Sequence, residues 1–120
     1  MIRVAILADD LIWATRLVDA VRATGADAVP LRSADALDQA LPTVDRVVVD
    51  LTARAYDGVA AIAAATSAGR PVLAVGQHDD QVLRRRARDA GADRVYAYRK
   101  LFDDGPATLA GWLGQTAARR

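Results

Sequence analysis

Residues 47–51 constrain the fold more than any other stretch of the chain. They comprise three consecutive valines, then Asp50 and Leu51. A run of β-branched residues is typical of a strand that is buried on both faces, as in the middle of a parallel sheet. A carboxylate is costly inside such a core, so we expect Asp50 where the strand emerges from it. Because ligands of open α/β sheets bind at the carboxyl ends of the strands, Asp50 is the first candidate for a functional residue.

Strand-like and helix-like segments alternate along the rest of the chain. The predicted strands cover residues 2–8, 26–32, 45–51, 71–75 and 92–98. The predicted helices cover residues 11–24, 34–41, 59–68 and 81–90, and a last helix opens at residues 103–106. This alternation predicts a parallel sheet that is covered by helices on both faces.

The two edges of the sheet can be assigned from polarity. Pro30 lies in the second strand, and proline cannot donate a hydrogen bond to a neighbouring strand, so this strand belongs at an edge. The fifth strand has mixed polarity, which suits the opposite edge. Right-handed crossovers then favour the flavodoxin-like order 2-1-3-4-5. We therefore predict one α/β domain over residues 1–120, with a doubly wound five-stranded parallel sheet and five helices.

Composition excludes several classes of function. The chain has 120 residues, 52% of them hydrophobic, which suits one folded domain and excludes disorder. It has no cysteine and a single histidine, His78, so thiol chemistry and sites with two imidazoles are excluded. No apolar run is long enough to span a bilayer, which predicts a soluble cytoplasmic protein without membrane contact. The net charge of +1 gives no argument for nucleic acid as a partner.

Acidic residues end the two strands that flank the predicted switch point of the sheet. The first strand ends in Asp9 and Asp10, and the third ends in Asp50. Three converging carboxylates repel one another unless a cation or proton shares the site. Oxygen ligands without histidine or cysteine suit Mg²⁺, which also binds phosphate. A carboxylate beside such an ion can act as a nucleophile and form an aspartyl phosphate.

The chain resembles the receiver domain of two-component response regulators over essentially its whole length. Asp9 and Asp10 match the acidic pair of that family, and Asp50 matches its phosphoacceptor. The distance from Asp50 to residues 57–58 keeps the family's spacing, and residues 91–93 match its glycine-alanine-aspartate turn.

This resemblance implies a stand-alone CheY-like domain in phosphorelay signalling. Asp50 would accept the phosphoryl group, Asp10, Asp50 and the backbone carbonyl of Thr52 would bind Mg²⁺, and Asp9 would act through water. The implied donor is a histidine kinase or phosphotransfer protein. The fourth helix, fifth strand and fifth helix would contact a downstream protein or a second copy. Enzyme activity would be limited to autocatalytic phosphorylation and dephosphorylation of the aspartate.

Two positions depart from the family's pattern. The family has a threonine or serine at the end of the fourth strand, where this chain has Gly76. It has a lysine at the end of the fifth strand, where direct counting from Gly91 gives Tyr98. Lys100, the sole lysine, lies two residues later and shares a strand face with Tyr98. An extended fifth strand or a bulge would bring Lys100 to the site as a displaced switch residue.

These departures leave alternatives open. The first is a pseudo-receiver, which has the same fold but acts as a protein-interaction module without a working phosphoswitch. The second is a small Mg²⁺-dependent phosphotransfer enzyme that uses the same carboxylates. The run of arginines at residues 84–86 and 88 is compatible with a solvated helix face or with a partner surface.

Overall fold

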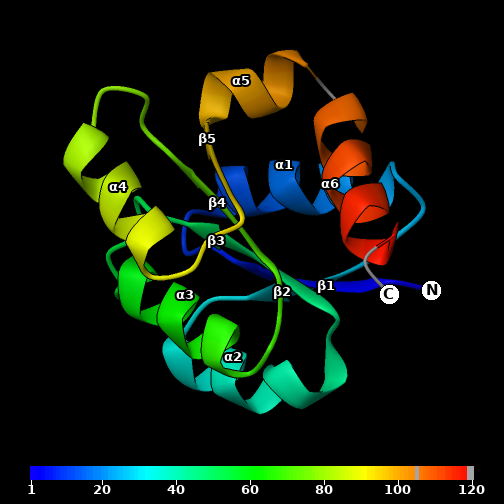
Figure 1. Cartoon of the computed structure of the whole chain (residues 1–120), viewed down its shortest axis with the longest axis horizontal. Coiled ribbons are helices and arrows are strands. Elements are labelled where there is room, and N and C mark those ends of the chain that lie inside the picture. The colour runs from blue at the N-terminus through cyan, green and yellow to red at the C-terminus, as the bar shows by residue number, and fades with distance from the viewer. Residues whose placement is uncertain (105, 119–120) are drawn as a thin grey trace.

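A five-stranded parallel sheet forms the centre of the molecule (Figure 1). The computed structural model describes residues 1–104 and 106–118, with 106 and 115–118 described by their backbone alone. The strand order is β2-β1-β3-β4-β5, which confirms the flavodoxin-like prediction. The strands are β1 (Arg3–Leu7), β2 (Asp27–Leu31), β3 (Arg46–Asp50), β4 (Val72–Gly76) and β5 (Arg94–Ala97).

Six α-helices occur in the described residues, one more than the five predicted. They are α1 (Leu11–Arg22), α2 (Ala34–Ala40), α3 (Gly58–Ser67), α4 (Gln81–Asp89), α5 (Tyr98–Asp103) and α6 (Pro106–Ala118), and a short 3-10 helix, η1 (Leu41–Thr43), follows α2. The additional helix is α5, because β5 ends at Ala97 and the chain turns into a helix at once. The predicted last helix corresponds to α6.

The helices cover both faces of the sheet. Helices α2, α3 and α4 lie on one face, and α1, α5 and α6 lie on the other (Figure 1). The first core includes Leu37, Ile62 and Ala87, and the second includes Leu17 and Leu109. The valines of β3 alternate between the two cores: Val47 and Val49 belong to the first, and Val48 belongs to the second. The prediction of a strand buried on both faces is confirmed, since every residue of β3 is buried.

The register of the central strands brings the predicted acidic residues to one end of the sheet. Leu7 of β1 lies beside Val49 of β3, so the segment after β1 begins next to Asp50. Pro30 is exposed in the outer strand β2, as predicted for an edge. The carboxyl end of the sheet is therefore where the candidate site has to be sought.

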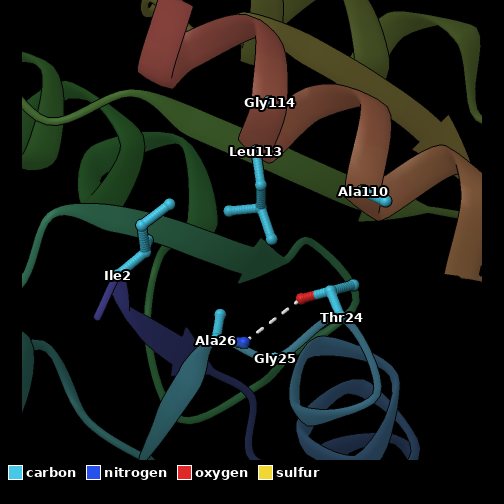
Figure 2. A pocket seen from close by; sticks show the side chains of 7 residues that line it. All are labelled: Ile2, Thr24, Gly25, Ala26, Ala110, Leu113 and Gly114. Atoms are coloured by element: carbon cyan, nitrogen blue, oxygen red, sulfur yellow. Dashed lines mark hydrogen bonds between the residues drawn. The ribbon is translucent and has the colours of Figure 1, made fainter.

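A cavity at the opposite end of the sheet lacks charged groups. It has a volume of about 290 Å³ and lies between the start of β1, the turn after α1 and helix α6 (Figure 2). Figure 2 shows Ile2 and Leu113 facing this space, while the Thr24 hydroxyl accepts a hydrogen bond from the Ala26 amide at 3.4 Å. In the part of the chain that the structure describes, no helix is long and apolar enough to cross a membrane.

Candidate functional site

Asp50 is the last residue of β3, and its side chain is fully buried. Its Oδ1 atom accepts hydrogen bonds from the Thr52 amide at 3.0 Å, from the Thr52 hydroxyl at 2.9 Å and from the Tyr98 hydroxyl. The hydroxyl oxygens of Thr52 and Tyr98 lie 2.5 Å apart. The Oδ2 atom of Asp50 has no hydrogen-bond partner among the described residues. The carboxylate is thus held from one side by neutral donors.

Tyr98 reaches Asp50 because the fifth strand ends early. It is the first residue of α5, and its ring stacks on Trp13 of α1 with 4.2 Å between the ring centroids. Burial, and then the hydrogen bond to Asp50, raise the pKa of the Tyr98 hydroxyl, so it stays protonated and remains a donor. Counting from Gly91 predicted Tyr98 at the position of the family's lysine, but not that its hydroxyl would contact Asp50. The sequence did offer one signal for this contact, since a tyrosine hydroxyl that is buried at the end of a strand usually finds a hydrogen-bond partner.

Asp9 and Asp10 use their carboxylates to hold the backbone. Asp9 Oδ2 accepts hydrogen bonds from the amides of Arg54 and Ala55, at 2.8 and 2.9 Å. The pKa of Asp9 is lowered, chiefly by the hydrogen bond from Ala55. Asp10 is the N-cap of α1, where its Oδ1 accepts from the amides of Ile12 and Trp13 at 2.9 and 3.1 Å. Both aspartates therefore satisfy donors that a loop or helix end leaves unpaired.

The predicted cluster of three carboxylates does not form. The ends of β1 and β3 are adjacent, but the side chains of Asp9 and Asp10 turn to the loop after β3 and to α1. Within residues 1–104 and 106–118, no three acidic or histidine side chains are grouped so that they could hold a metal ion. The predicted ligand set of Asp9, Asp10, Asp50 and the Thr52 carbonyl therefore does not fit Mg²⁺ in this arrangement, since the three carboxylates do not share one site.

The predicted route by which Lys100 reaches the site is wrong. The fifth strand is not extended past Ala97, and Lys100 lies in helix α5 with its side chain exposed. Its Nζ is 2.5 Å from Asp104 Oδ2, one helical turn further on. This contact raises the pKa of the Lys100 ammonium group. Helical rather than extended backbone after Ala97 is what directs Lys100 away and Tyr98 inward.

Tyr56 is a site residue that the sequence did not indicate. Its hydroxyl lies 2.9 Å from the carbonyl oxygen of Leu7 and 2.6 Å from that of Asp50, so it links the ends of β1 and β3. Burial, followed by the charges of Asp50 and Asp9, raises the pKa of the Tyr56 hydroxyl. Its partners are backbone carbonyls, which carry no residue pattern, so no motif could have predicted this contact.

Gly76 ends β4 in a closely packed position. A Cβ atom there would lie 3.3 Å from Cδ1 of Leu51, which is tighter than ordinary side-chain contact. A serine or threonine at this position would require Leu51 to shift. Gly76 therefore lacks the hydroxyl of the family's threonine or serine, and the side chain of Leu51 fills the space that such a residue would need.

Comparisons with known proteins identify the architecture. No protein-family model matches the sequence, and no curated protein matches it. Among solved structures, the chain is similar to the signal receiver domain of a DNA-binding response regulator from Colwellia psychrerythraea 34H, with a TM-score of 0.81, 19% identity and coverage of 98% of this chain and 99% of that one.

Two further structures show the same architecture. One is a CheY-like receiver domain protein from Methanospirillum hungatei JF-1, with a TM-score of 0.81, 14% identity and coverage of 99% and 95% of the two chains. The other is a putative pilus assembly-related protein from Burkholderia pseudomallei K96243, with a TM-score of 0.77, 22% identity and coverage of 98% and 90%. With strand order β2-β1-β3-β4-β5 and Asp50 at the end of the third strand, the chain has the fold of a response-regulator receiver domain, in a divergent form.

Proposed function

We propose that the chain is a pseudo-receiver, a signalling module that acts through protein contacts and does not use phosphorylation of Asp50 as its switch. The observation that carries this proposal is the state of Asp50, whose side chain is fully buried and accepts hydrogen bonds from Thr52 and Tyr98. A carboxylate in this state is a structural acceptor, and a phosphoryl donor has no open approach to it.

Electrostatics support the same proposal. A phosphoryl group brings two negative charges, and catalysis of its transfer depends on cations placed where that charge develops. Among the described residues, no lysine or arginine forms an ion pair with Asp50, and Lys100 pairs with Asp104 instead. The hydroxyl that would follow the phosphate is also absent at Gly76. Both the acceptance of phosphate and the response to it therefore lack their usual groups.

A surface for protein contacts is available on α4. Arg85, Arg86 and Arg88 are exposed there, whereas Arg84 is partly buried and donates to the carbonyl oxygens of His78 and Val95. This surface, together with β5 and α6, corresponds to the region predicted to contact a downstream protein or a second copy. Its positive charge favours a partner that presents acidic side chains.

A second candidate function is phosphoryl acceptance at Asp50 from a histidine kinase or phosphotransfer protein, with Mg²⁺. One observation favours it: Asp50 Oδ2 is buried but has no hydrogen-bond partner among the described residues, so its lone pairs are available for nucleophilic attack once the site opens. This function requires Tyr98 to leave Asp50, and Asp9 and Asp10 to exchange backbone donors for a metal ion.

Treatment with acetyl phosphate and Mg²⁺ separates the two functions. Intact mass and sensitivity to hydroxylamine are measured on the wild type, on Tyr98→Phe and on Asp50→Asn. The pseudo-receiver predicts no hydroxylamine-sensitive phosphate on the wild type. Stoichiometric labelling of the wild type that Asp50→Asn abolishes would refute the proposal and establish the second candidate. Labelling of Tyr98→Phe alone would show that the Tyr98 hydroxyl is what closes the site.

A further inference from the structure

A second cavity lies at the carboxyl end of the sheet, outside Tyr98. It has a volume of about 460 Å³, which is within the range of small-molecule sites. Its walls come from α1, from the loop after β4 and from α5, and they include Trp13, Arg16, His78, Tyr98 and Phe102. Unlike the apolar cavity in Figure 2, it combines aromatic rings with charged side chains, which are those of Arg16, Arg99 and the acidic Asp103.

Arg16 gives this cavity a cation that is open to a ligand. The side chain is exposed, and its guanidinium carbon lies 5.3 Å from the ring centroid of Trp13 and 5.4 Å from that of Phe102. No carboxylate pairs with Arg16 in the described part of the chain, whereas Arg99, the other arginine of the cavity, pairs with Asp103 at 3.4 Å. A planar guanidinium held against aromatic rings presents its remaining N–H groups to a carboxylate or phosphate.

The aromatic side chains of this cavity are stacked on one another, and Trp13 and Phe102 are only partly buried, so part of their ring surface is open to a ligand. Trp13 stacks on Tyr98 with 24° between the ring planes, and on Phe102 with 25° and 5.4 Å between the centroids. Such rings favour a ligand that is itself flat, because stacked aromatic pairs gain energy beyond the area they bury. The open ring surface of Trp13 and Phe102, together with Arg16, favours a ring and a negative charge in the same molecule.

We propose that this cavity binds a small organic anion that carries a planar ring. The inference goes beyond the proposed function, because it assigns a ligand to the molecule and not only a protein partner. The ligand would touch Tyr98, whose hydroxyl donates to Asp50, and so would contact the candidate site without any phosphoryl transfer.

AMP is a suitable probe, since it joins an adenine ring to a phosphate. Adenosine has the ring without the phosphate, and inorganic phosphate has the charge without the ring. Binding is followed by NMR shifts of the Trp13 indole and the Phe102 ring. We expect AMP to bind saturably with a Kd below about 1 mM, and each of the two fragments to bind at least about tenfold more weakly.

The matched variants are Arg16→Gln and Arg85→Gln, which each remove one exposed arginine from a helix surface. Arg16→Gln is expected to weaken AMP binding at least about tenfold, and Arg85→Gln to leave it unchanged. Thermal unfolding confirms that both variants are folded. The proposal is overturned if AMP gives no saturable shifts up to about 10 mM. It is also overturned if inorganic phosphate binds as well as AMP, or if both variants lose binding equally.

Discussion

The side chain of Asp50 sets the energetics of the candidate site at the scale of single residues. An ionised carboxylate that is removed from water is costly unless donors replace the water it loses. Here the donors are two hydroxyls and one amide, from Thr52 and Tyr98, all directed at Oδ1. Tyr98 is the only one of these donors that comes from a distant part of the sequence, so it links the end of β3 to the start of α5.

Removal of the Tyr98 hydroxyl should therefore destabilise the protein. Tyr98→Phe keeps the ring stacked on Trp13 and deletes the hydroxyl that donates to Asp50 and also contacts the Thr52 hydroxyl. Because a hydrogen bond to a charged group contributes about 1.5–3 kcal/mol, we expect a loss of that size in the free energy of unfolding. Urea unfolding at neutral pH measures the change.

A double-mutant cycle with Asp50→Asn tests whether the stability lost in Tyr98→Phe comes from the hydrogen bond between Tyr98 and Asp50. If the hydroxyl acts through Asp50, Tyr98→Phe should cost clearly less in the Asp50→Asn background, with a coupling of about 1 kcal/mol or more. An equal cost in both backgrounds would show that Tyr98 stabilises the fold by another route.

Residue patterns predicted Asp50 but missed its partners. The valine run before Asp50 indicated a buried strand, and Asp50 does end it. Desolvation predicted a carboxylate that emerges from the core, which is wrong, because the side chain of Asp50 is fully buried and is held there by neutral donors. The Tyr98 contact depends on where β5 stops, and Tyr56 acts on backbone carbonyls of Leu7 and Asp50. Neither the Tyr98 contact nor the Tyr56 contacts leave a periodic pattern in the sequence.

At the scale of elements, the loop between β3 and α3 is fastened to the end of β1. Asp9 accepts hydrogen bonds from two consecutive amides of that loop, those of Arg54 and Ala55. The loop then enters α3 through the N-cap Asp57, whose side chain accepts from the amide of Ala60. An aspartate that was predicted as a metal-site residue thus serves to fix the position of a loop.

Asp9→Ala should cost about 1 kcal/mol of stability at neutral pH, as expected when a side chain that satisfies backbone amides is removed. The pKa of Asp9 in the folded protein is below its ordinary value of 3.8, so its contribution is present above about pH 4 and is lost as the pH falls through the lowered pKa. The difference between wild type and variant should therefore be constant from about pH 5 to 7 and shrink in acid.

Asp38→Ala provides the control, because Asp38 is an exposed aspartate on α2 and should show little effect at any pH. Urea unfolding across the pH range measures both variants. A difference between wild type and Asp9→Ala that grows as the pH falls would contradict the assigned hydrogen bonds.

Helix and strand boundaries show where sequence patterns lose information. The predicted starts of the second and fourth helices, at residues 34 and 81, agree with α2 and α4. The end of the fifth strand was misplaced, because residues 98–103 are as compatible with a strand extension as with a short helix. That single boundary decides whether Lys100 shares a strand face with Tyr98 or turns away from Asp50 in a helix.

At the scale of the whole molecule, the topology could be predicted because general packing rules leave few choices. Alternating strands and helices, Pro30 at an edge and right-handed crossovers select the order β2-β1-β3-β4-β5. The same rules bring the ends of β1 and β3 together, but they do not fix where carboxylates on those ends point. Side-chain direction depends on which backbone amides are left unpaired nearby, and here Asp9 and Asp10 satisfy them.

This arrangement predicts the response of the whole protein to magnesium. A ligand that binds only the folded state raises the free energy of unfolding by RT ln(1 + [L]/Kd), which is about 1.4 kcal/mol when its concentration is ten times Kd. Because Asp9, Asp10 and Asp50 do not form one cluster, Mg²⁺ at about 10 mM should change the stability of the wild type by less than about 0.3 kcal/mol relative to NaCl of equal ionic strength.

Asp50→Asn is the matched control for this measurement, since it removes the central charge of any such site. Equal, small effects of Mg²⁺ on the unfolding of both proteins are the expected result. A stabilisation of the wild type by about 1 kcal/mol or more that is absent in Asp50→Asn would contradict the prediction. It would mean that Asp9 and Asp10 release their backbone donors in solution and bind the metal ion instead, because only then could the three carboxylates bind one Mg²⁺ ion together. Phosphoryl acceptance at Asp50 would then be favoured over the pseudo-receiver.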